Sequence, residues 1–287
     1  MIKKFLLIVT CYGVAACNLS TEENVNERQL SPVLEKLWES DTLLTANESV
    51  IYDSLTNSIY VSCMGAMPDD AKDGDGFIAK LSLKGEIDNL SWITGLNCPK
   101  GLAIYGRELY VSDIDELVCI DLDKGIVISK TRFPEIDFIN DIDISENGEI
   151  FLNETRKNKI YSLKNDSLSL FYSTEKLGGL NGVHSSKDGV FFTGSEGKIY
   201  ALNDKVELRV AADSVENADG IEQYKSGYFA SSWQGRIYYF TEGGHTSKLI
   251  DTWDNQIHSA DIDVVDNLNL LLSPTLFNNK VIAYRIK

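Results

Sequence analysis

Residues 141–163 read DIDISENGEIFLNETRKNKIYSL, and this stretch decides the fold. It begins with a short segment, 141–144, in which polar and apolar residues alternate as in a β-strand. The Asn-Gly pair at 147–148 supplies the positive φ angles that a tight hairpin needs, and a second apolar run follows it. A third apolar run, 159–163, comes after another polar turn. The stretch therefore predicts three consecutive short β-strands.

This unit recurs along the chain with a nearly constant period. Successive first strands start 40, 41, 38 and 41 residues apart, and most are followed by second and third strands in the same phase. A period of about 20 to 50 residues is typical of solenoids and propellers, and three or four short strands per repeat indicate a propeller blade. No segment has a long apolar period of 3.6 residues, which disfavours a helical fold. The five first strands begin at Gly101, Asp141, Gly182, Gly220 and Asp261.

A sixth unit precedes these five and begins at Ser49, which lies 52 residues before Gly101 because an extra loop, about 64–76, is inserted. We therefore predict an all-β fold, a six-bladed β-propeller over residues 33–287. The last unit ends after its third strand, which would leave an unpaired edge. The strand-like run 33–38 is predicted to supply the missing outer strand, complete the last blade and close the ring.

The chain is acidic, with 27 Lys and Arg against 43 Asp and Glu and a net charge of −16 over 287 residues. The electrostatic field of so negative a chain repels phosphate backbones and anionic bilayers, so we expect no nucleic acid partner. An acidic surface suits a metal cation, although it also serves solubility. We expect a small-molecule ligand that is sugar-derived, and a protein partner stays open.

The N-terminus has the pattern of a signal peptide, predicted as residues 1–16. Lys3 and Lys4 precede a mostly apolar run that ends at Val14 and is too short to span a bilayer. The following Ala-Ala-Cys17 resembles the lipobox of bacterial lipoproteins, in which cleavage precedes the Cys and its thiol carries lipid. The alternative is an ordinary cleavage site with an incidental Cys17.

The polar segment 17–32 lacks a sustained apolar period and is predicted to be a flexible tether. A tether of this kind, with lipid on Cys17, predicts a cell-envelope protein that faces the periplasm or the cell surface. Its only membrane contact would be the lipid anchor.

Three cysteines remain in the propeller and cannot all pair within one chain. They lie in or beside apolar runs, so we expect buried, unreactive thiols, with one disulfide left open. These cysteines are Cys63, Cys98 and Cys119.

The repeat also predicts a site at one mouth of the central channel. The innermost strands of a propeller line this channel, so the residues at their starts converge in space. Buried carboxylates at such positions repel one another unless a cation or a proton relieves them. Calcium prefers about 6–8 oxygen ligands, and the His and Cys ligands of zinc are missing here. The positions just before the first strands are Glu48, Lys100, Asn140, Asn181, Asp219 and Ala260.

These observations predict a divalent metal, with calcium the expected ion. The alternative is that the Asn and Asp side chains at the strand starts cap blade turns through local hydrogen bonds. For Asp261, at the start of the last first strand, an acidic oxygen in the site and a turn cap are equally favoured.

Four motifs stand in phase with the repeat: Glu48-Ser-Val-Ile-Tyr, Asn140-Asp-Ile, Asn181-Gly-Val and Asp219-Gly-Ile. In this order they resemble the metal-site motifs of the gluconolactonase (senescence-marker-protein) family of six-bladed propellers. The resemblance runs from about Trp38 to the C-terminus. It implies a divalent metal held by Glu48, Asn181 and Asp219, with Asn140 in contact with the substrate or with water on the metal. It further implies lactone ring opening, with Asp219 taking a proton from water.

The chain departs from the family pattern at two places. Ser49 and Val50 stand where a glycine and a proline usually follow the Glu, and Phe138 stands where an arginine is common. Lys100 brings a positive charge into the same ring, where it either replaces that arginine or pairs with Glu48 and competes with the metal. Lys100 and Asp261 therefore join Asn140 as predicted substrate-side residues.

The function predicted from these motifs is a divalent-metal-dependent, lactonase-like hydrolase of a sugar lactone or related ester. The alternative is a non-catalytic ligand- or protein-binding propeller lipoprotein, because propellers carry many unrelated functions. The acidic loop 69–76 lacks two essential ligands of a calcium-binding EF-hand and is predicted to be a surface loop. Of the histidines, His184 is expected in the core, and His258 is near enough in sequence to Asp261 to reach the mouth.

Overall fold

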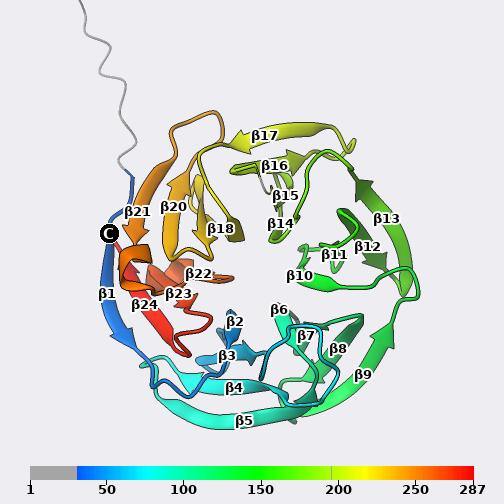
Figure 1. Cartoon of the computed structure of the whole chain (residues 1–287), viewed down its shortest axis with the longest axis vertical. Coiled ribbons are helices and arrows are strands. Elements are labelled where there is room, and N and C mark those ends of the chain that lie inside the picture. Colours follow the sequence, from blue (N-terminus) through cyan, green and yellow to red (C-terminus); the bar gives the residue numbers. More distant parts are fainter. Residues whose placement is uncertain (1–30, 195) are drawn as a thin grey trace, which may run out of the picture. The chain divides into compact units, whose positions relative to one another are not determined.

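Six sheets surround a central channel in the computed structural model, which describes residues 31–194 and 196–287 (Figure 1). Each sheet has four antiparallel strands, and in the first five blades the strands follow chain order from the channel outward. The predicted all-β, six-bladed propeller is therefore confirmed.

The strands of the first three blades match the repeated apolar runs of the sequence. The first blade contains β2 (Asn47–Asp53), β3 (Ser58–Cys63), β4 (Gly76–Ser82) and β5 (Ile87–Leu96). The second contains β6 (Pro99–Tyr105), β7 (Glu108–Asp113), β8 (Glu116–Asp121) and β9 (Ile126–Arg132). The third contains β10 (Ile139–Ile144), β11 (Ile150–Glu154), β12 (Lys159–Lys164) and β13 (Ser167–Ser173).

The remaining blades follow the same plan. The fourth contains β14 (Val183–Ser186), β15 (Gly189–Gly194), β16 (Lys198–Leu202) and β17 (Leu208–Ala212). The fifth contains β18 (Ala218–Tyr224), β19 (Gly227–Ser232), β20 (Arg236–Phe240) and β21 (Ser247–Asp251). The last contains β22 (Asp263–Val265), β23 (Leu270–Pro274), β24 (Val281–Ile286) and β1 (Leu34–Glu39).

Within residues 31–194 and 196–287, helix is limited to two short 3-10 turns, η1 (Trp253–Asn255) and η2 (Asp266–Leu268). In the part of the chain that the structure describes, no helix is long and apolar enough to cross a membrane.

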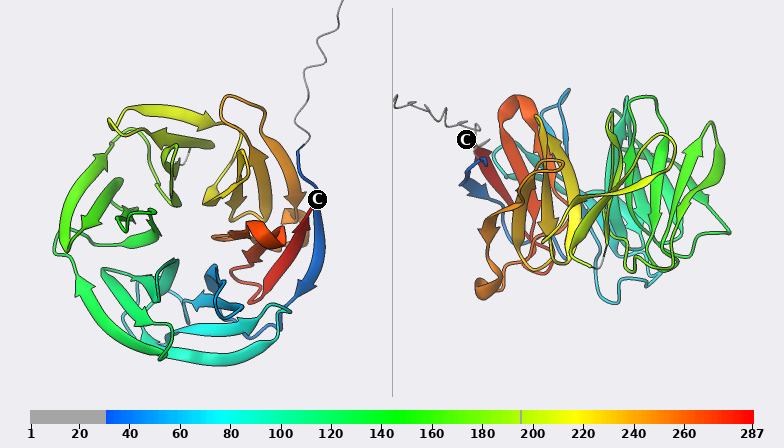
Figure 2. Two further views of the ribbon diagram at one scale, coloured as in Figure 1. Left: turned by 180° about the vertical axis from the view of Figure 1, so that it is seen from behind. Right: turned by 90° about the horizontal axis from the view of Figure 1, so that it is seen from above.

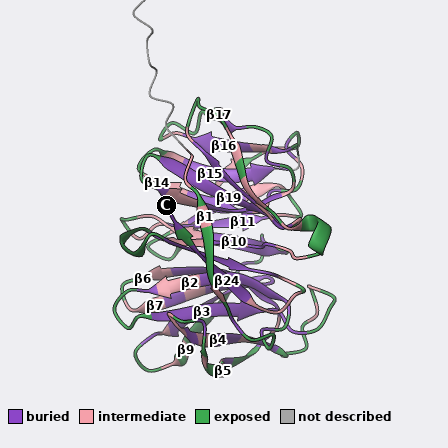
Figure 3. Ribbon diagram, turned by 90° about the vertical axis from the view of Figure 1, so that its left-hand side faces the viewer, coloured by how far each residue is buried: buried purple, intermediate pink, exposed green. Residues whose placement is uncertain are grey.

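The ring is closed by the N-terminal strand, as predicted. β1 pairs antiparallel with β24, from Leu34 opposite Ile286 to Glu39 opposite Ile282. Val33 and Lys287 extend this pairing with two reciprocal backbone hydrogen bonds of 3.1 and 3.0 Å. Figure 2 shows β1 (blue) along the outer side of β24 (red), and Figure 3 shows that β1 is the exposed outer strand of its blade. The unpaired edge expected from the sequence is therefore covered.

Neighbouring blades pack against one another through apolar side chains. Between the first two blades, Tyr60, Ile78, Leu109, Val111 and Val118 belong to one fully buried cluster. Burial of this kind is the main favourable contribution to folding. It also holds the six inner strands at fixed positions around the channel.

The inner strands carry β-bulges where the predicted site residues lie. In four blades, two residues of the first strand face one residue of the second, so the pairing shifts register. Bulges redirect side chains and are frequent beside functional sites. The bulged pairs are Glu48-Ser49, Lys100-Gly101, Asn140-Asp141 and Asp219-Gly220.

Polar side chains of the second strands satisfy the backbone groups that the bulges leave unpaired. Ser62 Oγ accepts a hydrogen bond from Ser49 N at 2.9 Å, and Ser231 Oγ accepts one from Gly220 N at 2.9 Å. Buried backbone N–H groups rarely lack a partner, because an unpaired one costs free energy. These serines therefore stabilise the bulges.

The inner strands come closest just behind the mouth, where several blades have glycine. A side chain at Gly182 would overlap the carbonyl oxygen of Asp219 in the next blade. Ser49 and Asp261 meet across the first and last blades as an isolated parallel bridge. These contacts show that residues about 40 positions apart in sequence do converge at one level of the channel.

Candidate functional site at the mouth of the channel

The structure brings the predicted metal-site residues to the same mouth. Glu48 and Asp219 occupy bulges and are only 7% and 6% exposed. Asn181 directly precedes Gly182, which abuts the backbone of Asp219. Asn140, in the bulge of the third blade, is also buried. The folded chain therefore gathers the residues of the four motifs around one opening.

Two oxygen atoms of this site lack a partner among the described residues. Glu48 Oε2 and Asn181 Oδ1 are both buried and accept no hydrogen bond. Leaving a buried acceptor unsatisfied costs about 1–3 kcal/mol, and more for a charged group. Carboxylate and amide oxygens are the ligands that calcium prefers. The donor set therefore fits a hard divalent cation.

A cation here would depend on the amide oxygen of Asn181. Within residues 31–194 and 196–287, no three His, Cys, Asp or Glu side chains are arranged to hold a metal ion by themselves. The predicted set has two carboxylates and one amide, and remaining positions would be filled by water or substrate.

Burial, together with neighbouring carboxylates, raises the pKa values of both Glu48 and Asp219. Burial, together with the nearby charge of Asp219, raises the pKa of Glu48 to about 8. Burial and the charge of Asp261 raise the pKa of Asp219 to about 7. The positive charge of Lys100 offsets part of both shifts. A bound cation would favour the ionised forms in the same way.

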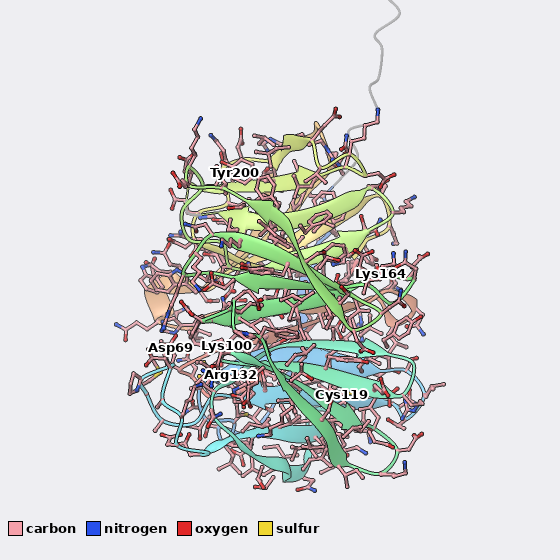
Figure 4. The ribbon with its side chains drawn as sticks, turned by 90° about the vertical axis from the view of Figure 1, so that its right-hand side faces the viewer. Asp69, Lys100, Cys119, Arg132, Lys164 and Tyr200 are labelled. Carbon is pink, nitrogen blue, oxygen red and sulfur yellow. The ribbon has the colours of Figure 1, made fainter. Side chains whose placement is uncertain are left out.

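Lys100 lies at the mouth, but its ion-pair partner is not the one considered from the sequence. Its Nζ atom lies 3.6 Å from Asp69 Oδ2 and donates to Met64 Sδ at 2.9 Å. Asp69 and Lys100 come together at one face of the propeller (Figure 4). The acidic loop between β3 and β4 therefore reaches over the mouth, and the Lys100 charge acts on Glu48 without a direct ion pair.

Phe138 contacts two positively charged side chains. The Arg156 guanidinium lies 4.4 Å from the centre of its ring, and Lys100 Nζ lies 5.4 Å from it. Such cations are attracted to the ring face. Arg156 also pairs with Asp70 at 2.7 Å. Sequence reasoning missed Arg156, because it comes from the turn between β11 and β12 and its proximity depends on the fold.

Asp261 is tied to the first blade. Its Oδ2 accepts a hydrogen bond from Ser49 Oγ at 2.7 Å, and its backbone N donates to Glu48 O at 2.9 Å. Its side chain also lines a cavity of about 170 Å³ inside the channel. A contact with substrate stays a prediction, whereas the link between blades is observed.

Further along the channel, other carboxylates connect neighbouring inner strands. Asp141 Oδ2 accepts from Val183 N at 2.7 Å, and Asp143 Oδ2 accepts from Ser185 N at 2.6 Å. On the opposite side of the ring, Asp263 Oδ2 accepts from Tyr52 N at 2.8 Å. This contact between blades was not predicted from the sequence. The only signal was the shared Asp-Ile-Asp pattern at 141–143 and 261–263.

Two other groups of residues agree with their predicted structural roles. His184 is buried in β14, with Nδ1 3.4 Å from Asp143 Oδ2, and burial lowers its pKa. Cys63, Cys98 and Cys119 are buried and free, and burial raises the pKa of each thiol. The expectation of buried thiols is therefore confirmed, and because thiolate is the reactive form, their low reactivity stays a prediction.

The fold and the site define a six-bladed β-propeller with a buried, oxygen-rich site at one mouth of its channel. No protein-family model matches the chain, and no curated protein sequence matches it either.

Solved structures resemble the chain in fold. A gluconolactonase from Xanthomonas campestris has a TM-score of 0.67 at 15% identity, covering 90% of this chain and 95% of that one. A catalytically inactive virginiamycin B lyase from Staphylococcus aureus, solved with quinupristin, has a TM-score of 0.61 at 12% identity, covering 89% and 99%. A chain of a nidogen/laminin complex has a TM-score of 0.58 at 14% identity, covering 70% and 77%. The resemblance to a gluconolactonase is therefore confirmed for the fold.

The predictions for the N-terminus concern residues outside the described part of the chain. They are the signal peptide 1–16, lipidation of Cys17, and all but the last two residues of the tether 17–32.

Proposed function

We propose that the protein is a divalent-metal-dependent hydrolase of the lactonase type, which opens a sugar lactone or a related ester at the channel mouth. The observation that supports this most is the pair of buried acceptors without partners, Glu48 Oε2 and Asn181 Oδ1, beside a second buried carboxylate, Asp219. A stability-driven arrangement would pair such groups. A bound cation would supply the partner that both oxygens lack.

Glu48, Asn181 and Asp219 would hold the metal, and calcium suits their hard oxygen donors best. When bound, the cation supplies a Lewis acid that polarises the ester carbonyl.

Asp219 would act as the general base. A carboxylate beside a cation stays ionised at neutral pH and can accept a proton from water. As the water oxygen bonds to the carbonyl carbon, its proton passes to Asp219, and the ring C–O bond breaks. The same proton then returns to the ring oxygen that leaves. The product is a hydroxy acid.

Positive charge at the mouth would stabilise the oxyanion and the carboxylate product. Lys100 is buried there, and Arg156 lies on the same Phe138 ring. Fixed charges in a buried site stabilise developing charge without reorganisation. Asn140 and Asp261 would bind substrate hydroxyl groups.

The test is hydrolysis of glucono-1,5-lactone and other lactones by purified residues 31–287, with calcium and after its removal by chelation. We expect turnover that requires calcium and is lost in Glu48→Gln and Asn181→Ala. Glu146→Gln, an exposed change in the turn between β10 and β11, is the matched control. Calcium binding without turnover of any lactone or ester would instead favour the non-catalytic binding propeller.

We further propose that lipid on Cys17 attaches the propeller to the cell envelope. Support comes from the lipobox-like sequence alone. Mass spectrometry of the membrane fraction should find a diacylglyceryl group on Cys17, and Cys17→Ser should release the protein. A soluble wild-type protein without lipid would contradict this.

A further inference from the structure

Four aromatic rings gather on the side of the propeller that carries the candidate site. They are contributed by two adjacent blades and by the connection between them. Trp233 and Trp253 meet edge to face, with ring centres 5.7 Å apart and an angle of 89°. The His258 ring lies nearly parallel to Trp233 and perpendicular to Trp253. Phe277 packs edge to face on His258 at 5.4 Å. We call these four residues the aromatic rim.

The aromatic rim is joined to the mouth through backbone contacts. Trp233 N donates to Asn217 O at 3.3 Å, two residues before Asp219. Leu276, next to Phe277, bridges Asn47, the residue before Glu48. His258 lies three residues before Asp261, whose backbone N donates to Glu48 O. The rim therefore flanks the part of the mouth that carries Glu48 and Asp219.

The rim is exposed although it is apolar. Trp233, Trp253 and Phe277 are 39%, 36% and 51% exposed. Large aromatic side chains in mutual contact lose little further entropy when a ligand binds, because their rings are already held by one another. His258 is also fixed, since its backbone N and its Nδ1 both contact Asn278 Oδ1. The rim is therefore a preorganised surface.

A cavity of about 330 Å³ opens on the rim, lined by Trp253, Asp254, Gln256 and His258. This is at the small end of ligand pockets, which span about 300–1,000 Å³, and suits one ring. Its walls combine two aromatic rings with one carboxylate and one amide. A ligand that matches them has an apolar face for stacking and hydroxyl groups at its edge.

We propose that the aromatic rim is a subsite for a hexopyranose ring. The C–H face of such a ring would stack on Trp253, while its hydroxyl groups would bond Asp254 and Gln256. A sugar ring offers hydroxyl groups to Asp254 and Gln256, which a flat aromatic ligand does not. This proposal rests on the proposed lactone hydrolysis at the mouth. It adds the class of substrate to that function. Together they assign as substrate a glycosylated sugar lactone, whose lactone ring enters the mouth while a second sugar lies on the rim.

Sugar binding can be measured without any turnover. The probe is cellobiose, titrated into residues 31–287 while the indole N–H signals of the four tryptophans are followed by NMR. We expect the signals of Trp233 and Trp253 to shift, with a dissociation constant on the order of 1–10 mM for a one-ring site. Trp38 and Trp92 should not respond.

Variants define the subsite. Trp253→Ala and Phe277→Ala should each weaken cellobiose binding, Trp253→Ala by about tenfold or more, judged by the remaining Trp233 signal. Tyr105→Ala is the matched control, because Tyr105 is a 45% exposed aromatic residue at the opposite end of an inner strand. No shift of either tryptophan at 100 mM cellobiose, or binding that Trp253→Ala leaves intact, overturns the proposal. A response to tetramethylammonium or indole without one to cellobiose also overturns it.

A kinetic measurement separates this proposal from the proposed function. We expect the lactone of cellobionic acid to have a KM about tenfold below that of glucono-1,5-lactone, and Trp253→Ala to abolish this ratio. Lactone turnover with equal KM values and no cellobiose binding would contradict the sugar subsite and support the proposed hydrolase. Cellobiose binding at the rim without any lactone turnover would contradict the proposed hydrolase and support the sugar subsite.

Discussion

Two sets of carboxylates line the channel of this propeller, and they differ in what they contact. Asp141, Asp143 and Asp263 each accept a backbone N–H of the neighbouring inner strand. Glu48, at the mouth, has an oxygen without a partner in the described chain, and Asp219 raises its pKa further. Both sets are acidic, but Asp143 and Asp263 are only partly buried. Position in the channel alone therefore does not separate the carboxylates that link neighbouring blades from Glu48, whereas their hydrogen-bond partners do.

The difference between the two sets of carboxylates is tested most strongly by replacing Asp219, the proposed general base. Asp219→Asn keeps the size of the side chain but abolishes its proton exchange, and general bases contribute about 10²–10⁴-fold to rate. We expect kcat for lactone hydrolysis to fall by at least that factor, measured at saturating calcium. The calcium-free variant should unfold at the same or a higher temperature, because a repelling charge is gone. A variant with normal kcat would contradict the role of Asp219.

The pH dependence of stability should be the next largest effect. The pKa of Glu48 is about 8 and those of Asp219 and Asp263 are about 7, all raised chiefly by burial. Raised carboxylate pKa values favour the protonated folded state, so this stability is full below the unfolded values and is lost as pH rises through about 7–8. Without calcium, the free energy of unfolding should fall between pH 5 and 8 by a few kcal/mol, at about 1.4 kcal/mol per pKa unit.

Thermal unfolding at each pH, in chelator, measures this trend. Stability that increases steadily from pH 5 to 8 without metal would show that the mouth carboxylates are not buried as described.

Calcium should stabilise the folded chain through the mouth. A ligand present at about 100 times its dissociation constant adds about 2.7 kcal/mol if it binds only the folded state. We expect a rise in melting temperature with calcium at pH 8, and its loss in Glu48→Gln. Asp143→Asn, in the other set, should keep the calcium response. Equal loss in both variants would place the ion elsewhere in the channel.

The smallest expected effect is on stability, and it concerns the carboxylates that accept hydrogen bonds from a neighbouring blade. Asp263→Ala removes the acceptor of Tyr52 N, a partly buried group, and the loss of one such hydrogen bond costs about 1 kcal/mol. Chemical denaturation should detect this loss, while calcium-dependent turnover relative to folded protein is retained. An Asp263→Ala protein as stable as the wild type would mean that the hydrogen bond from Tyr52 N does not stabilise the fold.

The sequence predicted the architecture because a propeller repeats its own pattern. The period of about 40 residues, the hairpin at Asn147-Gly148 and the unpaired last unit together led to six blades and to closure by 33–38. The same phase placed Glu48, Asn140, Asn181 and Asp219 at one mouth. Local patterns of this kind reflect backbone geometry, which the sequence carries directly.

What the sequence did not predict depends on contacts between distant residues. The direction of the Asp143 side chain is set by the neighbouring blade, and Arg156 reaches Phe138 only because two loops meet. The aromatic rim collects Trp233 and Phe277 from separate blades. The bulges that orient Glu48 and Asp219 were also missed, since no local residue type announces an extra residue in a strand.

The pairing of β1 with β24 has a consequence for how the protein is made. The strand formed by Leu34–Glu39 is synthesised before the first five blades, but its partner, Val281–Ile286, is synthesised after them. Contacts so distant along the chain form slowly, because a long loop must be closed before they are gained. The circle can therefore be completed only after synthesis has reached the end of the last blade. Until then, β1 is an open edge that a cell must keep from pairing with other chains.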